Sequence, residues 1–280
     1  MADVGKINKL TVVRKAEHGI YLSGDRQSDI LMPKAYVPDH CAIDDELDVF
    51  VYRDSEDRII ATTQTPLAMV GDFAFLKVVG TTPVGAFLDW GLQKDLLVPF
   101  KEQRYRMKEG QSYVVFIYLD EDTDRVAASS KLNKFLNYEP AAYSEGEEVS
   151  LLIFEKNDLG YQAIINNAHA GMIYENEVFQ PVQIGQQLTG FVSKIRSDGK
   201  IDLALQKTGY KNIDPIITLI LNYLKEHDGK MNITDKSEPE LIHATFGISK
   251  KNFKKALGAL YKEKIIDIGK DFIKLTQNNI

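Results

Sequence analysis

The chain has 280 residues, more than one typical domain, and 44% of them are hydrophobic, so every segment can bury a core. A single cysteine, Cys41, excludes a disulfide framework and a thiolate metal cage, and the metalloprotease, acyl-transfer and nucleotide-binding motifs are all missing. We therefore predict a protein with no catalytic site, no cofactor and no bound metal.

Hydropathy and charge narrow the class further. The longest apolar run, Tyr113–Leu119, is too short to span a membrane, and the first ten residues do not resemble a signal peptide. A cytoplasmic location is expected. Residues 1–199 carry 20 basic and 30 acidic residues, a net charge of −10, whereas residues 200–280 carry 14 and 10, a net charge of +4. The C-terminal quarter is therefore the better candidate for a polyanion partner.

An internal repeat organises the first 208 residues. The segment Gly19–Leu22 recurs 66 residues later as Gly85–Leu88, and Gly160 lies 75 residues beyond Gly85. Asp44, Gly110 and Gly185 keep the same two steps. Such fixed spacing is typical of a structural unit used several times. We predict three units, at residues 1–65, 68–135 and 146–208.

Each unit reads as short strands. In the second unit Ala74, Leu76 and Val78 alternate with residues that face the other way, and an acidic turn at 120–124 leads into Arg125. Five strands in about 65 residues, with a central glycine that permits a sharp bend, favour a small closed barrel of the oligonucleotide-binding type. The fold class is therefore mostly β and multidomain.

A winged-helix domain is predicted over residues 212–280, because the alternation there changes to helical spacing. An apolar stripe precedes Asp228, and a capping box at Ser237 and Glu240 opens a second helix that stops at Gly247. Ser249 caps a third helix, and two short strands follow. The order of helix, strand, helix, helix and hairpin is that of a winged helix.

The strings GAFLDWGLQKDLLVP and LDEDTDRVAASSK resemble the S1 RNA-binding domain, named after a ribosomal protein. The first unit (GIYL, ILMP) and the third (GYQAII, DGKIDLAL) are similar. With KIRSDGKIDLALQKTGY and SKKNFKKALGALYKE, the whole chain resembles the conserved virulence factor B family. That resemblance implies three S1-like barrels and a winged helix that binds RNA.

The resemblance also implies binding residues. Phe87 matches the ring that S1 domains present on their binding face, and Arg125 matches the basic residue that begins the last strand. Pro99 stands where a histidine is usual. In the third unit Gln162 replaces Phe87 and Tyr161 lies one place earlier, and a slip of one residue reverses the face that a side chain occupies.

Single-stranded RNA needs a basic surface and flat rings on which bases stack. We predict that it lies across the third barrel and the winged helix, in post-transcriptional control that includes virulence genes. The predicted contacts are Phe87, Arg125, Tyr161, Lys194, Arg196, Lys200, Lys207, Lys211, Lys250, Lys251, Lys254 and Lys255.

Alternatives remain open at this point. A winged helix more often reads duplex DNA, although the third helix offers mostly lysine and only Asn252 as a base-reading amide. The acidic first two barrels could instead bind a protein of the RNA machinery. Phe73, Phe75 and Trp90 are equally consistent with RNA contact and with packing in or between domains.

Overall fold

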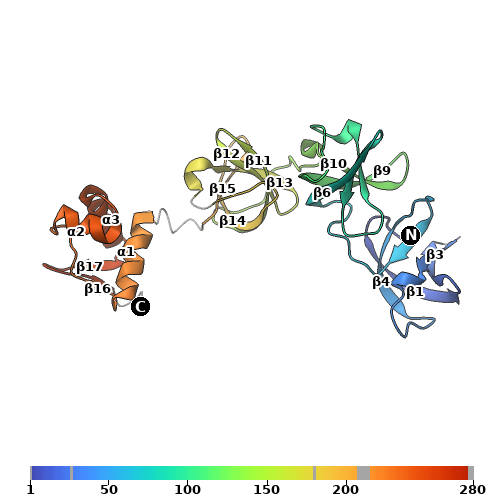
Figure 1. Cartoon of the computed structure of the whole chain (residues 1–280), viewed down its shortest axis with the longest axis horizontal. Helices are drawn as coiled ribbons and strands as arrows, with labels where there is room; N and C mark the ends of the chain where they lie inside the picture. The colour runs from blue at the N-terminus through green and yellow to red at the C-terminus, as the bar shows by residue number, and fades with distance from the viewer. Residues whose placement is uncertain (1, 26–27, 179–180, 207–214, 277–280) are drawn as a thin grey trace. The chain divides into compact units, whose positions relative to one another are not determined.

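The computed structural model describes residues 2–25, 28–178, 181–206 and 215–276. The chain divides into two compact units, residues 1–208 and 209–280. The first unit contains three closed five-stranded barrels, and the second contains three helices and a three-stranded sheet (Figure 1). The predicted fold class is confirmed.

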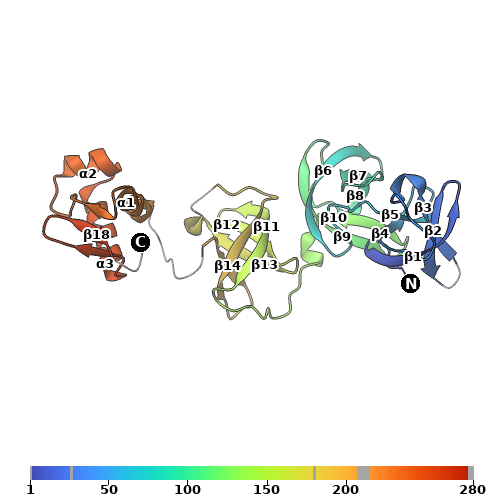
Figure 2. The same cartoon turned by 90° about the horizontal axis from the view of Figure 1, so that it is seen from below.

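The three barrels share one strand order, in which the third strand lies beside the fifth. Barrel 1 consists of β1 (Ile7–Ala16), β2 (Gly19–Asp25), β3 (Ser28–Pro33), β4 (Glu46–Arg53) and β5 (Ile59–Thr62). Barrel 2 consists of β6 (Phe73–Thr82), β7 (Gly85–Asp89), β8 (Leu96–Pro99), β9 (Ser112–Asp120) and β10 (Arg125–Ser129). Barrel 3 consists of β11 (Glu148–Asn157), β12 (Gly160–Ile165), β13 (His169–Tyr174), β14 (Gln187–Ile195) and β15 (Ile201–Ala204). The third and fifth strands pair in parallel and the other neighbours are antiparallel, as in an oligonucleotide-binding fold (Figure 2).

A short 3-10 helix follows the third strand of each barrel. The three helices are Lys34–Tyr36 (η1), Phe100–Glu102 (η2) and Glu175–Glu177 (η4). A further 3-10 helix, η3 (Leu132–Lys134), follows the last strand of barrel 2.

The turn before the fourth strand is the same in every barrel. Its central residue has a left-handed backbone, with φ of 70° at Asp44, 81° at Gly110 and 87° at Gly185. The N–H group of that residue donates to the first strand of its own barrel, at 2.9 Å to Val12 O, 2.9 Å to Val78 O and 2.7 Å to Ile153 O. The left-handed region suits glycine, and aspartate tolerates it better than most residues. The repeated landmark in the sequence therefore marks a repeated turn.

Close backbone packing explains the glycine that opens the second strand. A side chain at Gly19, Gly85 or Gly160 would overlap a carbonyl oxygen of the neighbouring third strand. In barrel 2 that oxygen belongs to Val98, the residue before Pro99, which itself pairs with Gly85. The two strands can approach this closely only because Gly85 lacks a Cβ.

Barrels 2 and 3 share an apolar core of their own. Phe73 is 6% exposed and clusters with Leu152 and Ile164 of barrel 3. Asn167 joins the backbones, because its side-chain oxygen accepts from Phe73 N at 2.7 Å and its side-chain nitrogen donates to Gly71 O at 2.9 Å. The interpretation of Phe73 as an inter-domain packing residue is thus confirmed.

The second unit has the order predicted for a winged helix. Its elements are α1 (Pro215–Glu226), β16 (Lys230–Met231), α2 (Pro239–Phe246), α3 (Lys250–Lys262), β17 (Ile266–Ile268) and β18 (Ile273–Leu275). The three helices and the sheet enclose one apolar core, in which Ile220, Leu224 and Phe253 are fully buried. The sheet order is β16-β18-β17, so β18 is the central strand.

The helix ends agree with the sequence in one of two cases. The Ser249 hydroxyl accepts from Asn252 N at 3.3 Å and caps α3 as predicted. The capping box at Ser237 was wrong, because Glu238 is the N-cap of α2 and makes no side-chain cap hydrogen bond. The Ser237 hydroxyl instead accepts from Thr234 N in the preceding turn.

We expect the substitution Gly85→Ala to destabilise barrel 2 by about 2 kcal/mol or more, because the new methyl group must displace the β8 backbone. The matched control is Gly80→Ala in the same barrel, where a Cβ meets open space. Thermal unfolding followed by circular dichroism measures both. Equal stability of the two variants would contradict the packing argument.

Candidate nucleic-acid interface

On the outside of each barrel, four side chains form a row across the second, third, fifth and fourth strands. We call it the cross-strand row. In barrel 1 the row is Tyr21, Leu31, Ile60 and Tyr52. In barrel 2 it is Phe87, Leu97, Ala127 and Tyr118. In barrel 3 it is Gln162, Met172, Asp202 and Lys194. The rows of barrels 1 and 2 are thus aromatic and aliphatic, and that of barrel 3 is mostly polar and charged.

Two predicted contacts, Phe87 and Arg125, line a groove of about 370 Å³ where barrels 1 and 2 meet. Leu97 and Pro99 add apolar surface to the groove, and Lys101 adds a further positive charge. Phe87 is half-exposed there. The groove therefore combines a flat ring with cations, within a surface that both barrels supply.

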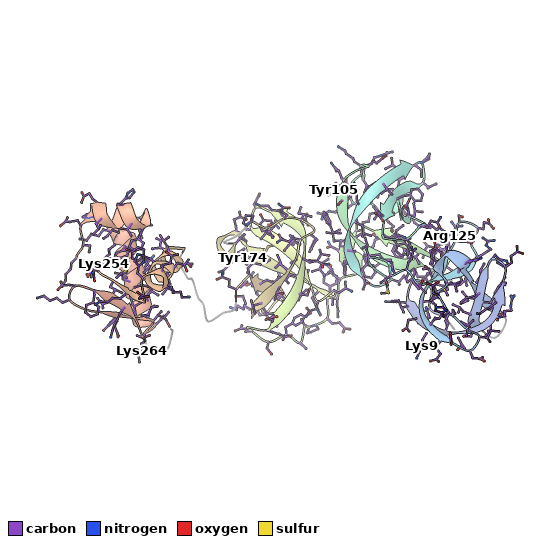
Figure 3. All side chains as sticks on the ribbon, turned by 60° about the horizontal axis from the view of Figure 1, so that its bottom comes forward. Lys9, Tyr105, Arg125, Tyr174, Lys254 and Lys264 are labelled. Atoms are coloured by element: carbon purple, nitrogen blue, oxygen red, sulfur yellow. The ribbon has the colours of Figure 1, made fainter. Side chains whose placement is uncertain are left out.

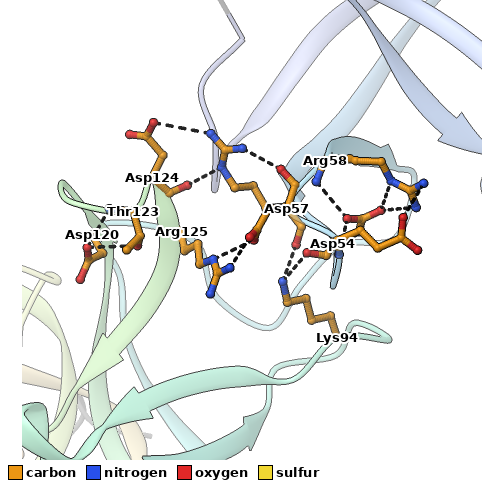
Figure 4. A network of polar contacts seen from close by, with 10 residues as sticks. Asp54, Asp57, Arg58, Lys94, Asp120, Thr123, Asp124 and Arg125 are labelled. Carbon is orange, nitrogen blue, oxygen red and sulfur yellow. Dashed lines mark hydrogen bonds and ion pairs between the residues drawn. The ribbon is translucent and has the colours of Figure 1, made fainter. Parts of the chain in front are cut away.

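Arg125 is engaged across the seam between barrels 1 and 2 (Figure 4). Its Nε donates to Asp57 Oδ1 at 2.7 Å, and its terminal nitrogen pairs with the other oxygen of the same carboxylate. In return Arg53 of barrel 1 donates to Asp124 O at 3.0 Å. The hydrogen bond from Arg125 holds the pKa of the Asp57 carboxyl below its usual value. The structure thus gives Arg125 a role in joining the barrels.

Lys94 closes the same seam. Its Nζ donates to Arg53 O at 2.9 Å and to Asp54 O at 2.6 Å (Figure 4). Burial, together with repulsion from Arg125, lowers the pKa of this ammonium group. Two backbone carbonyl groups therefore satisfy a cation that is partly removed from water.

The apolar part of the seam is centred on Trp90. The indole is 2% exposed and meets Phe50 of barrel 1 edge-on, with ring centroids 5.6 Å apart. Tyr52 and Ile60, two members of the barrel 1 row, are buried in the same cluster. Trp90 is therefore an inter-domain packing residue, and half of the barrel 1 row is covered by barrel 2.

Tyr161 is not a surface ring, and its predicted role in base stacking is corrected. It is 8% exposed and lies in the barrel 3 core, paired with Ile173 on the neighbouring strand. It occupies the place of Ile20 and Ala86, which are also buried. Strand alternation decides this outcome, because the residue after the glycine faces inward and the next one faces outward.

The predicted basic cluster of barrel 3 lies on and beside its cross-strand row. Lys194 is exposed. Arg196 Nε donates to Asp202 Oδ2 at 2.9 Å, and Lys200 pairs with Asp198 at 3.0 Å. Lys207 and Lys211, also predicted as contacts, lie outside the described residues.

Tyr174 is a surface ring that the sequence prediction missed. It is half-exposed at the end of β13, and its hydroxyl oxygen accepts a hydrogen bond from the Arg196 guanidinium (Figure 3). The guanidinium carbon lies 5.6 Å from the ring centroid. Tyr174 follows Pro33 and Pro99 at the repeat steps of 66 and 75 residues, so the spacing itself could have identified it.

In the winged helix, α3 separates an apolar face from a basic one. Phe253, Ala256, Leu257 and Leu260 are buried. The four predicted lysines all lie away from that stripe, with Lys251, Lys254 and Lys255 exposed and Lys250 half-buried. Lys254 lies 3.9 Å from Asp235, a weak pair for a side chain that is 70% exposed (Figure 3). The lysines therefore present positive charge to solvent.

Comparison with known proteins follows this architecture. Models of the S1 domain match residues 4–64 and 70–130, and a model of the CvfB-like winged helix domain matches residues 218–275. The chain belongs to the conserved virulence factor B family. The family's S1 and winged-helix domains indicate nucleic-acid binding, and it is not an enzyme family.

Relatives share the full length of the chain. Conserved virulence factor B of Staphylococcus epidermidis is 26% identical over 98% of this chain and 95% of its own. The protein YitL of Bacillus subtilis is 26% identical over 90% of this chain and 87% of its own. A crystal structure of a multidomain protein with nucleic acid binding domains from Streptococcus pneumoniae covers 98% of both chains, with 23% identity and a TM-score of 0.44.

Two other kinds of site were sought in the described part of the chain. It contains no helix with the length and apolar character needed to cross a membrane. Nor do its histidine, cysteine, aspartate and glutamate side chains gather in threes or more in a way that could hold a metal ion.

Replacing Asp57 with asparagine (D57N) should loosen the seam in a pH-dependent way. Because the pKa of this carboxyl is lowered by folding, the unfolded chain binds more protons, and stability rises with pH. The contribution is present above the ordinary carboxyl pKa of 3.8 and is lost as the pH falls through the lowered value. Urea unfolding should show D57N to be less stable than the wild type at pH 7, with a smaller difference near about pH 3.

The control is D158N, at an exposed aspartate of barrel 3. A D57N defect that is equally large at both pH values would show that the ion pair is not its cause.

Proposed function

We propose that the chain binds single-stranded RNA without a chemical step, mainly through barrel 3 and the winged helix. The observation that carries the proposal is the contrast among the cross-strand rows. Tyr52 and Ile60 are buried against barrel 2, whereas Lys194 and Gln162 of barrel 3 remain open to solvent. Barrel 3 thus offers hydrogen-bonding and cationic groups at the place where barrel 1 packs against its neighbour.

Barrel 3 also combines the two elements that single-stranded RNA requires. Tyr174 supplies a half-exposed ring, and Arg196 supplies a planar cation that is in contact with it. A base can stack on such a ring for about 1–3 kcal/mol, largely irrespective of its identity. Lys194 and Lys200 add positive charge for the phosphates.

The winged helix adds the larger positive surface. The α3 lysines, with Lys207 and Lys211 in the preceding segment, would neutralise phosphates and release counterions. Phe87 stays in the proposal as a further ring, in the groove between barrels 1 and 2. In the cell, this binding would act in the cytoplasm as post-transcriptional control of gene expression, including virulence genes.

Neutralising the α3 lysines (K250Q, K251Q, K254Q and K255Q together) is expected to weaken RNA binding and to flatten its salt dependence. Each lost phosphate contact removes about 0.7 from the slope of log K against log salt for a single strand. Fluorescence anisotropy with a labelled uridine-rich RNA, titrated at several salt concentrations, measures both quantities.

The same experiment with duplex DNA as competitor tests the rival proposal of a DNA-reading winged helix. Displacement of RNA by equimolar duplex DNA would favour that rival. An unchanged salt slope in the lysine variant would remove α3 from the interface.

Removing the barrel 3 ring (Tyr174→Ala) should reduce RNA affinity by a factor that corresponds to about 1–3 kcal/mol, with the fold intact. Tyr174→Phe keeps the ring and is expected to bind nearly as well as the wild type. The control is Tyr138→Ala, at a tyrosine that is 75% exposed and lies between barrels 2 and 3 in the sequence. An effect of Tyr174→Phe as large as that of Tyr174→Ala would point to the hydroxyl group and its contact with Arg196, not to stacking.

A further inference from the structure

A second basic and aromatic surface lies on barrel 2, in the segment Phe100–Lys108 that follows β8. Its nine residues, FKEQRYRMK, contain four basic residues and one acidic residue, a net charge of +3. Residues 1–199 as a whole carry a net charge of −10, so this segment is a local exception. We call it the RYR loop, after Arg104, Tyr105 and Arg106 at its centre.

Two buried residues hold the RYR loop in place. Gln103 is 9% exposed and its amide donates to Val98 O at 3.0 Å, while its carbonyl accepts from Met107 N at 3.0 Å. Met107 is 3% exposed and packs into the core that barrel 2 shares with barrel 1. The three residues between these anchors are therefore held outward on a fixed base.

The outward residues are flat and cationic. Tyr105 is 71% exposed (Figure 3). The guanidinium carbon of Arg104 lies 5.4 Å from its ring centroid, and that of Arg106 lies 4.9 Å from the Phe100 ring. Each cation thus lies close to a ring, and the exposed tyrosine leaves room for another flat group.

The acid within the loop does not cancel these charges, because it is already engaged. The Glu102 carboxylate accepts from the Ser129 hydroxyl at 2.7 Å and pairs with Lys134 at 2.9 Å. Burial alone would raise the pKa of this group, but the bonds from Ser129 and Lys134 lower it. Glu102 therefore stays ionised and is matched by a lysine that lies outside the loop.

The RYR loop is continuous with barrel 3. Arg104 forms a two-point ion pair with Glu155, at 2.9 and 3.0 Å. Glu155 pairs across the ladder with Gln162, the first member of the barrel 3 cross-strand row. A strand of RNA that follows the row toward Gln162 therefore comes next to Arg104.

We propose that the RYR loop is a second contact for the same single-stranded RNA, with Tyr105 stacking on a base and Arg106 and Lys101 binding phosphates. This inference rests on the proposed function, because it extends the RNA path from barrel 3 to barrel 2. The pairing of an exposed ring with cations favours a nucleic acid, since both the base and the phosphate find a partner. The loop adds length to the bound strand and leaves the barrel 3 contact unchanged.

The test compares the full-length wild type with the double variant Y105A/R106Q on two labelled uridine-rich RNAs. One RNA has about 6 nucleotides, within the range of a single barrel, and the other has about 24. The control is Y138A/K77Q, which removes an exposed ring and an exposed cation elsewhere on the first unit. Because Tyr105 and Arg106 are both exposed, thermal unfolding of the variant should match that of the wild type.

We expect Y105A/R106Q to bind the long RNA about fivefold or more weakly and the short RNA as the wild type does. The salt slope on the long RNA should fall by about 0.7 for the lost arginine. Unchanged affinity for the long RNA, an equal loss on both lengths, or the same loss in the control would overturn the inference.

The two proposals fail in different ways. If the wild type binds RNA and the Tyr174→Ala and lysine variants weaken it, but Y105A/R106Q does not, only the RYR loop is excluded. If the wild type does not bind RNA, or if Tyr174→Ala and the lysine variants bind as the wild type does, the proposed function fails. The second contact then fails with it.

Discussion

The closed five-stranded ladder is the constraint on which every other feature of the first unit depends. Because side chains alternate across a strand, the pairing register decides which residues fill the barrel and which reach its surface. The same register occurs three times, fixed by a left-handed turn before the fourth strand and by a glycine at the start of the second. The scaffold is thus constant, and the outward positions are left to differ.

Those outward positions are used in two ways. In barrel 1, Tyr52 and Ile60 pack against barrel 2, and the ion pairs of Arg53 and Arg125 complete that seam. In barrel 3, the corresponding positions carry Lys194 and Asp202, which face solvent in full or in part. One surface of a common fold therefore serves internal assembly in one repeat and remains available for a ligand in another.

Much of the architecture followed from the sequence, because spacing and alternation are local properties. The steps of 66 and 75 residues predicted three barrels, and the helical stripe with Ser249 predicted α3. Tyr161 shows the limit, since a ring one place from its expected position lies on the opposite face of the strand. Applying the same steps to Pro33 and Pro99 would have led to Tyr174.

Contacts between repeats could not be found in this way. Arg125 matches a binding residue by position, yet its partner Asp57 lies 68 residues away in another barrel. The RYR loop was also overlooked, because the net negative charge of the first 199 residues concealed a short basic segment. Long-range pairing and local charge both depend on which segments the fold brings together.

The cross-strand rows also bear on how such a protein can change over generations. A new side chain at Gln162 or Lys194 alters a solvent-facing surface and leaves the ladder intact, whereas one at Tyr52 or Ile60 disturbs the junction between two domains. Barrel 3 is therefore the repeat that can acquire a different binding preference with little loss of stability. The first two barrels form a foundation that tolerates far less variation.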